Sequence, residues 1–443
     1  MTTDAPTAEA VLAAAPPTPL ANAVRWKIFL YLGVLIVLLG FGSPGGGLIG
    51  LPVSFFLKNK LHLKAHEVAT FSLITHIPVY FAIAFGFARD QWNPFGMRDR
   101  GFMLIFGAVS AALFLFFAFT PPTYISLLIA YFLLWISFLF ILSAQRGLTS
   151  TIGQQHVMSG QVSAAWNIFE SLPGIASLLA GGILSDMMEG RGAAQAARLL
   201  FLLGAGIAVA LSLYGLWKPR AVFDNVHSER ITGANPLSDM ARLFKYWPIY
   251  PALFIWLLWN FAPGAATPLQ YYLQNTLHAK DAQWGQWNAI FAAGFIPTFM
   301  VFGLLCRRFP LRPLLFWGTV VAVPQMVPLL FIHSVTGALI CALPIGLMGG
   351  VATAAYIDLI IRSCPKGLQG TVLMMGVALA SIDTRAGDVL GAWLYDHFGG
   401  FTVCVIAITV VYALILPVLW LVPKRLTATR DGEAPPEAAA AAA

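Results

Sequence analysis

Charged residues are scarce in this chain of 443 residues. Asp, Glu, Lys and Arg make up only 10% of it, whereas 58% of the residues are apolar and the mean hydropathy is +0.77. An ordinary soluble domain carries about 25% charged residues, so this composition excludes that class. Runs of about 20 apolar residues recur, such as 101–119 and 401–423, and each is long enough to cross a bilayer as a helix. We therefore predict a polytopic membrane protein.

Cysteine and recognisable catalytic motifs are also scarce. The four cysteines, Cys306, Cys341, Cys364 and Cys404, lack the paired spacing of metal ligands, so we expect packing roles for them and no metal site. The sequence contains no phosphate-cradling loop and no nucleophile elbow. We therefore expect no cofactor, and neither ATP-driven transport nor a membrane enzyme.

Twelve apolar segments are predicted to cross the membrane. The runs are continuous and do not alternate with a period of two, which favours helices over barrel strands. The twelve segments are 27–57, 66–89, 101–119, 123–145, 156–184, 196–217, 249–274, 283–305, 313–332, 335–361, 368–395 and 401–423. We predict an all-α membrane protein.

Composition also predicts the domain boundaries. Residues 1–24 are rich in Ala, Pro and Thr and lack the basic region of a signal peptide, so we expect a disordered tail, and a second one over 424–443. Residues 218–248 form a polar linker between six-helix bundles at 25–217 and 249–423. Apolar residues at helical spacing near its end predict an interfacial helix, or alternatively an early turn of the seventh segment.

The basic residues predict the orientation. With the segments placed as above, 19 of the 26 Lys and Arg residues lie on the side of the two termini. Positive charge concentrates on the cytoplasmic side, so we expect both termini there, in a multi-pass protein of the inner membrane. The net charge of +7 is thus explained by the bilayer, and we expect no nucleic-acid partner.

The two halves of the chain repeat one another. FFLKNKLHLK at 55–64 returns as YYLQNTLHAK at 271–280, and Ile77-Pro78 returns as Ile296-Pro297 at a spacing of 219. Later pairs keep a spacing of 210, among them Gly160 with Gly370 and Gly181 with Gly391. Six segments separate the copies, so both halves enter the membrane in the same direction and form two bundles related by an axis along its normal.

These features resemble the major facilitator superfamily, and more narrowly the folate-biopterin transporter family. GFARDQWNPFGMRDR, from Gly86, is similar to the superfamily's Gly-x-x-x-Asp-Arg-x-Gly-Arg-Arg signature, and 253–277, 309–320 and 364–372 are similar to stretches of the narrower family. Family members usually carry acidic and basic residues at the end of the fourth segment, where this chain has Arg146 without a carboxylate. The resemblance implies a 6+6 fold and alternating access.

Ionisable residues inside the predicted segments are the candidate coupling or substrate sites. A charge at a helix centre costs about 2 to 4 kcal/mol, so each invites a functional hypothesis. The candidates are His76, Glu170, Asp383, Arg385 and Asp388. The family fold would place the second and eleventh segments face to face, so the resemblance implies that His76 could pair with Asp383. A buried carboxylate here could act as a protonatable switch; the alternative is a permanent ion pair of Arg385 with Asp388 or Glu170.

Two further sets of residues are predicted from their positions. Aromatic rings beside amides suit a flat heteroaromatic solute, and the expected cavity-lining residues are Trp166, Asn167, Trp259, Asn260, Gln270 and Tyr271. The expected cytoplasmic gate residues are Asp90, Arg98, Arg100, Asp358 and Arg362. Pro and Gly at 43–47 and 263–264 indicate flexible or cavity-lining helix, although close helix packing also explains them.

The sequence as a whole favours a monomeric secondary transporter that moves a small organic solute by alternating access. We expect proton coupling, as in a symporter, and a solute that resembles a pterin or folate. Two alternatives remain open: a membrane assembly factor of the same fold that transports nothing, and an exporter of lipids or cell-wall fragments.

Overall fold

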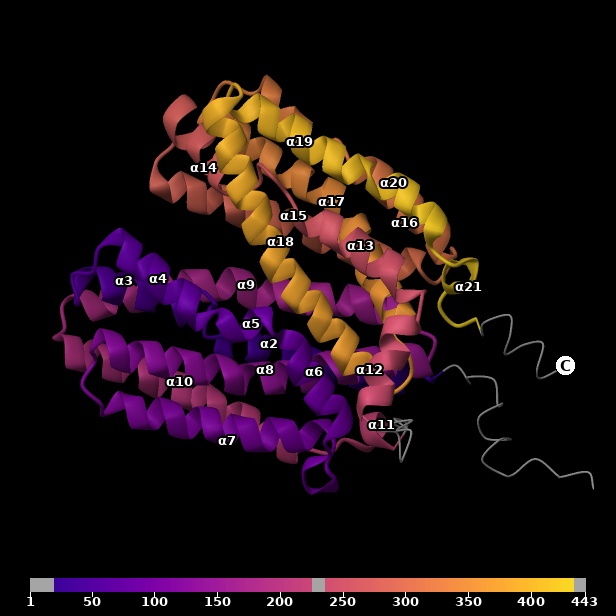
Figure 1. The fold of residues 1–443 in the computed structure, drawn as a ribbon, viewed down its shortest axis with the longest axis horizontal. Coiled ribbons are helices and arrows are strands. Elements are labelled where there is room, and N and C mark those ends of the chain that lie inside the picture. Colours follow the sequence, from indigo (N-terminus) through magenta and orange to yellow (C-terminus); the bar gives the residue numbers. More distant parts are fainter. Residues whose placement is uncertain (1–19, 225–235, 434–443) are drawn as a thin grey trace, which may run out of the picture.

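The computed structural model of the chain describes residues 20–224 and 236–433. Most of the predicted N-terminal tail, the middle of the predicted linker and the last ten residues lie outside this part. Within it, helices dominate and form two bundles joined by the linker (Figure 1).

The first bundle holds the predicted segments one to six. Its elements are α2 (Asn22–Gly42), α3 (Gly50–Asn59), α4 (Ala65–Thr75), α5 (Ile77–Tyr80), α6 (Ala82–Gln91), η1 (Pro94–Gly96), α7 (Asp99–Ala118), α8 (Tyr124–Gln155), α9 (Ser159–Glu189) and α10 (Ala193–Leu216).

The linker and the second bundle follow in the same style. The linker carries α11 (Arg220–Phe223) and α12 (Pro236–Lys245), so a separate helix lies where the sequence predicts one. The second bundle consists of α13 (Ile249–Asn260), α14 (Thr267–Tyr271), η2 (Tyr272–Thr276), α15 (Asp281–Leu305), α16 (Leu311–Ala322), η3 (Val327–Phe331), α17 (Val335–Ser363), α18 (Gln369–His397), α19 (Phe401–Ala413), α20 (Ile415–Val418) and η4 (Leu419–Leu421).

Several predicted segments are broken helices. In the described residues, nine helical spans are long and apolar enough to cross a membrane, and some of these contain breaks, such as Leu311–Phe331, which is divided between α16 and η3. The first segment is divided between α2 and α3 at SPGGG, because proline lacks an amide hydrogen and glycine weakens a helix. A hypothetical Cβ on Gly47 would lie 2.7 Å from the backbone nitrogen of Leu178 in α9. The glycines of this break therefore serve close helix packing.

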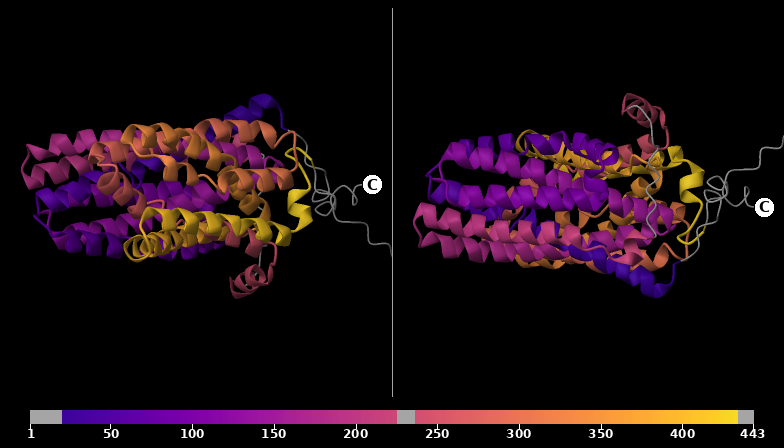
Figure 2. Two further views of the ribbon diagram at one scale, coloured as in Figure 1. Left: turned by 90° about the horizontal axis from the view of Figure 1, so that it is seen from above. Right: turned by 90° about the horizontal axis from the view of Figure 1, so that it is seen from below.

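The two bundles meet at one end and part at the other. We call the end that holds residues 20 and 433 the terminal end. Contacts between the bundles join α6 with α18, α9 with α15, and α8 with α18. Figure 1 shows α18 crossing the first bundle beside α6 and α12, while α14 lies away from α3, and Figure 2 shows the elongated shape from two further sides.

The C-terminal segment corrects one expectation. We predicted disorder from 424 onward, but residues up to 433 are placed against both bundles and include α21 (Lys424–Thr427). Thr427 and Asp431 are buried, at 2% and 7% exposure. The Arg-Asp-Gly stretch before the alanine run supplies hydrogen-bonding groups that composition alone did not reveal.

Candidate functional site: a closed terminal end below a charged centre

Hydrogen bonds between the bundles close the terminal end. Gln154 of α8 donates from Nε2 to the carbonyl oxygens of Ile361 and Cys364, at 2.8 Å each. Ser163 of α9 donates to the carbonyl oxygen of Ala354 in α17 at 2.7 Å. These hydrogen bonds all lie at the terminal end. They therefore fasten the two bundles together there.

Asp90, at the end of α6, holds the start of α18. Its Oδ1 accepts from the backbone amide of Gly370 at 3.1 Å, and its Oδ2 accepts from the amide and the hydroxyl of Thr371 at 2.7 Å each. The first amides of a helix have no partner inside the helix, and the helix dipole favours an anion there. Arg89 donates to Asp90 at 2.8 Å and to Asp99 at 2.5 Å. We call this contact the Asp90 latch.

The other residues expected at the gate are placed differently. Asp90 receives its charge-assisted bond from Arg89, whereas Arg100 donates to the carbonyl oxygens of Gly215 and Leu216 at the end of α10. The backbone amide of Arg98 donates to the side chain of Asn93. Sequence reasoning missed Arg89 as a gate residue, although it directly precedes Asp90.

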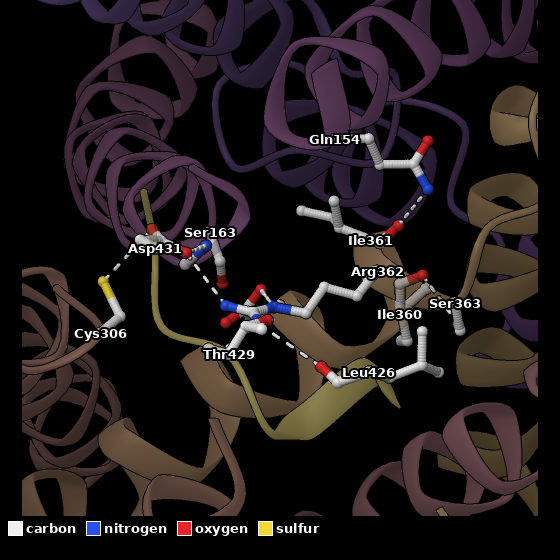
Figure 3. Close-up of polar contacts among 12 residues, drawn as sticks. Gln154, Ser163, Cys306, Ile360, Ile361, Arg362, Ser363, Leu426, Thr429 and Asp431 are labelled. Carbon is white, nitrogen blue, oxygen red and sulfur yellow. Dashed lines mark hydrogen bonds and ion pairs between the residues drawn. The ribbon is translucent and has the colours of Figure 1, made fainter. Parts of the chain in front are cut away.

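Asp358 and Arg362 form an ion pair near the terminal end of α17. Arg362 Nε lies 2.8 Å from Asp358 Oδ1, and the Asp358 side chain is fully buried. Asp358 Oδ2 has no hydrogen-bond partner. The other side of the Arg362 guanidinium contacts the C-terminal segment (Figure 3). This cluster therefore joins α17 to the end of the chain.

A second charged cluster lies deeper, in the first bundle. Arg146 of α8 donates to Glu170 Oε1 of α9 at 2.8 Å, and its guanidinium lies 3.8 Å from the ring centroid of Trp166. Trp166 donates to Glu170 Oε2 at 2.6 Å. Glu170 comes about 17 Å along α9 from its first residue, so the cluster lies near the middle of the bundle. It sits directly above the Ser163 contact that closes the terminal end.

The partner of Glu170 corrects one expectation. Arg146 has no carboxylate near it in sequence, and the alternative reading paired Glu170 with Arg385. The carboxylate instead reaches Arg146 from the next helix. The Glu170 side chain remains 50% exposed, whereas that of Arg146 is 12% exposed. Solvent or a solute can therefore reach the carboxylate while the guanidinium stays covered.

The ionisable residues of α18 are not paired as predicted. Asp388 accepts from the amide and hydroxyl of Thr267, at 2.8 Å each, and so caps α14 instead of binding Arg385. Asp383 is 8% exposed, and its Oδ2 has no hydrogen-bond partner. Arg385 is exposed and forms no ion pair or hydrogen bond with another described residue. Among the described residues, the second bundle thus contributes one carboxylate with an unpartnered oxygen and one exposed guanidinium.

His76 is not bonded to Asp383. Its Nδ1 lies 2.7 Å from the carbonyl oxygen of Ser72, and its ring centroid lies 5.0 Å from that of Trp135. The charge that acts on its imidazole from the second bundle is that of Arg385. His76 therefore does not form the predicted pair with Asp383.

Exposure changes along α18. Residues 369–374, at the terminal end, are buried between the bundles, whereas Ile382, Arg385, Val389 and Trp393 are exposed. These four follow the spacing of one helix face. A guanidinium group avoids lipid, so the face that carries Arg385 lines the space between the bundles.

The remaining candidates for the cavity mostly serve their own helices. Asn167 and Asn260 donate to carbonyl oxygens one turn earlier. Trp259 stacks on Tyr412, with ring centroids 4.6 Å apart. Tyr271 is 49% exposed and meets Tyr395 edge-on, and Gln270 is partly exposed. Trp166 is the member of this set that contacts the charged centre.

Metal binding finds no support in the part of the chain that the structure describes. The described residues bring no three His, Cys, Asp or Glu side chains together in a group that could hold a metal ion, and the four cysteines form no disulfide bond.

Two helical bundles, closed at one end and holding charged groups midway along their helices, define a multi-pass membrane transporter. The sequence model of the Major Facilitator Superfamily matches residues 159–382, which is half of the chain, and the protein belongs to this superfamily. It is also related to a folate-biopterin transporter of Synechocystis sp., with 22% identity over 91% of this chain and 83% of that protein.

Solved transporters share the fold. The structure of FucP in the outward conformation matches 90% of this chain and 99% of its own, with a TM-score of 0.69 and 13% identity. The proton:xylose symporter XylE matches 90% of this chain and 96% of its own, with a TM-score of 0.64 and 13% identity. The predicted twelve-segment fold and the resemblance to the superfamily are confirmed.

Proposed function

We propose that this protein is a proton-coupled secondary transporter of a small, flat, pterin-like solute, and that the described structure is its outward-facing state. In this proposal both termini are cytoplasmic, in the inner membrane, so the closed terminal end is the inner gate. The observation that carries the proposal is the charged centre. The Arg146 and Glu170 cluster lies directly above the closed end, and at similar depth in α18 Asp383 has an unpartnered oxygen and Arg385 is exposed.

The charge of this centre favours a neutral or singly charged solute. Arg146 is neutralised by Glu170, which leaves Arg385 as the cation of this centre without an ion-pair partner among the described residues. A folate carries two carboxylates and needs more than one such group, whereas a pterin ring needs a stacking face and a few polar partners. The half-exposed Glu170 carboxylate, held by Arg146 and by the buried Trp166 indole, supplies one such polar partner. The name of the Synechocystis relative supports the same solute class.

Asp383 is the proposed coupling residue. A buried carboxylate with an unpartnered oxygen is costly when ionised, and it gains from taking up a proton or from meeting a cation. Protonation in the outward-facing state and release on the inner side would link transport to the proton gradient. Charged groups kept at the helix centres favour transport over the role of an assembly factor, which needs none of them.

Uptake of labelled biopterin and folate tests this proposal. Cells expressing the chain are compared with empty-vector cells, with and without a proton uncoupler. We expect uncoupler-sensitive accumulation of biopterin that exceeds that of folate. No uptake of either compound would remove the pterin assignment, and uptake that ignores the uncoupler would remove proton coupling.

The Asp383→Asn variant tests the coupling residue. We expect it to lose at least tenfold in accumulation while biopterin still raises its melting temperature. Unchanged uncoupler-sensitive uptake in this variant would contradict the assignment of Asp383.

A further inference from the structure

The second half of the chain lacks its own copy of the Asp90 latch. The spacing of 219 that relates Ile77-Pro78 to Ile296-Pro297 pairs Asp90 with Phe309. Phenylalanine cannot accept a hydrogen bond from the start of a helix. The two halves are repeats, so the first amides of α9 need another acceptor at the position where α18 has Asp90.

The C-terminal segment supplies that acceptor. Asp431 Oδ1 accepts from the backbone amide of Gly160 at 3.2 Å, and Oδ2 accepts from the amide of Gln161 at 2.8 Å. These residues precede Gly370 and Thr371, the partners of Asp90, by the repeat spacing of 210. The two carboxylates thus bind equivalent amides, in the second and third residues of α9 and of α18.

An arginine accompanies each carboxylate. Arg89 lies 2.8 Å from Asp90 Oδ1, and Arg362 Nη2 lies 3.0 Å from Asp431 Oδ1. Arg362 also donates to the carbonyl oxygen of Thr429 at 2.8 Å. Figure 3 shows this guanidinium between the C-terminal segment and α17. The Asp431 side chain is fully buried, so the pair is shielded from water.

The backbone around Asp431 reaches from one bundle to the other. Its amide donates to the carbonyl oxygen of Cys306, at the end of α15, at 2.9 Å. The next residue, Gly432, donates to the carbonyl oxygen of Val157, just before α9, at 2.7 Å. Gly432 has a φ of +90°, a conformation that other residues rarely adopt. The chain therefore turns here from the second bundle onto the first.

We propose that Asp431 is a gating residue of this transporter: it acts as the second latch of the terminal end, in place of the carboxylate that the second half lacks. α9 and α15 belong to opposite bundles and cannot separate while Asp431 holds both. The C-terminal segment must therefore leave α9 each time the terminal end opens. This inference rests on the proposed alternating access, and its test needs no substrate.

Cys306 is a native reporter for this latch. Its side chain is 1% exposed, and its Sγ lies 3.6 Å from Asp431 Oδ2. Replacing the other three cysteines by alanine leaves Cys306 as the single thiol. We would measure its rate of labelling by N-ethylmaleimide in membranes that contain the full chain. We expect Asp431→Ala to raise this rate at least tenfold, and Asp431→Asn to raise it less because the amide oxygen can still accept one bond.

A second reporter distinguishes opening of the whole terminal end from a local loss of the cover over Cys306. Val389, on the exposed face of α18, is changed to cysteine in a chain without native cysteines, and a membrane-impermeant thiol reagent is applied to whole cells. If Asp431→Ala opens the terminal end, the opposite end closes more often, and we expect labelling at 389 to fall several-fold. Faster labelling of Cys306 with unchanged labelling at 389 would overturn the proposal, and so would no change at either position.

Matched variants complete the experiment. Glu433→Gln removes an exposed carboxylate of the same segment that pairs with Arg430, and we expect both rates to stay within twofold of the parent. Asp90→Ala should reproduce the effect of Asp431→Ala at 389. Asp431→Asn serves as the test variant if Asp431→Ala does not elute as a single species. Absence of biopterin uptake by the parent would count against the proposed function alone.

Discussion

The two halves of this transporter have the same helix-packing contacts away from the termini, but they differ in the polar contacts at the terminal end. Away from the termini, Gly181 of α9 packs against Gly47, and its repeat counterpart Gly391 of α18 packs against Gly264. At the terminal end, the first half binds the start of α18 through Asp90, which lies within the first bundle at the end of α6. The start of α9 is bound instead by Asp431, which follows the last helix of the second half. The repeat therefore keeps the helix-packing contacts more faithfully than the polar contact that governs opening.

The halves also differ in how they treat charge at the centre. In the first half, Arg146 is covered and bonded to Glu170, with Trp166 against it. In the second half, Arg385 has no polar partner among the described residues, and Asp383 has an unpartnered oxygen. The ion pair stabilises the first bundle, although the Nε of Arg146 has no hydrogen-bond partner, whereas Asp383 and Arg385 have no ion-pair partner among the described residues and are available to a solute or a proton.

The largest expected effect concerns the glycines at the terminal end. A Cβ on Gly86 would lie 2.4 Å from the carbonyl oxygen of Gly370, so Gly86→Ala must push α6 away from α18. Overpacking of this kind costs about 1 to 3 kcal/mol, which corresponds to roughly a fivefold to 150-fold loss of the closed state. Labelling of cysteine at 389 and uptake measure it.

Gly160→Ala sharpens this comparison between halves. Its added carbon would lie 2.7 Å from Cys306 Cβ, a side-chain atom, so we expect a smaller effect than at Gly86. The control is Gly182→Ala on the same helix, where no atom lies within 4 Å of the added carbon. An effect at Gly182 equal to that at Gly86 would show that general helix changes, and not the contact, are being measured.

An intermediate effect is expected from removing the central arginines. Arg146→Met leaves Glu170 and the Trp166 indole without their partner. We expect the free energy of unfolding to fall by about 1 to 2 kcal/mol, a limited loss because Glu170 is half exposed to solvent. Thermal melting in detergent should show this as a drop of a few degrees.

Arg385→Met should behave in the opposite way. This side chain has no polar partner in the described residues, so we expect unchanged melting together with at least tenfold weaker biopterin uptake. Arg308→Met, at an exposed position, controls for the loss of a positive charge. Equal melting losses for Arg146→Met and Arg385→Met would remove the distinction between the halves.

The smallest expected effect is the pH dependence of the Asp431 latch. Burial raises the pKa of Asp431 from an ordinary value of 3.8 to about 6, and the nearby Asp358 carboxylate adds to the rise. Arg362 and the amides of Gln161 and Gly160 oppose it without cancelling it. Asp431 and Asp358 share the one guanidinium of Arg362. Between pH 3.8 and about 6, Asp431 therefore carries a proton more often in the docked segment than in the released segment.

Docking should therefore strengthen as pH falls from 7.5 to 5.5, by roughly fourfold. The measurement is the Cys306 labelling rate of Asp431→Asn divided by that of the parent at each pH, because this ratio cancels the titration of the thiol itself. We expect the ratio to rise as pH falls. A ratio that falls instead would mean that the ionised carboxylate is the better latch.

The sequence predicted the parts of this structure that depend on local pattern. Continuous apolar runs marked the twelve segments, and Pro44 with its following glycines marked the break between α2 and α3. The constant spacing of the repeated residues indicated that the chain folds as two matching bundles. These features follow from composition and periodicity, which act over short stretches of chain.

Pairings between distant residues could not be predicted in this way. Arg146 finds Glu170 on the next helix, and Asp388 caps α14 from more than 100 residues away. Asp431 binds amides 270 residues earlier, in a stretch whose composition resembles a tail. Its signal in the sequence was indirect: Phe309 stands where the repeat calls for a carboxylate.

The position of Asp431 after the twelfth segment has a consequence for biosynthesis. All twelve membrane segments are made and can insert before the ribosome reaches this residue, so the second latch is completed after both bundles. A chain shortened before Asp431, by a nonsense mutation or by proteolysis, retains both bundles and its whole charged centre. Such a chain is expected to reach the membrane with one side of its terminal end unfastened.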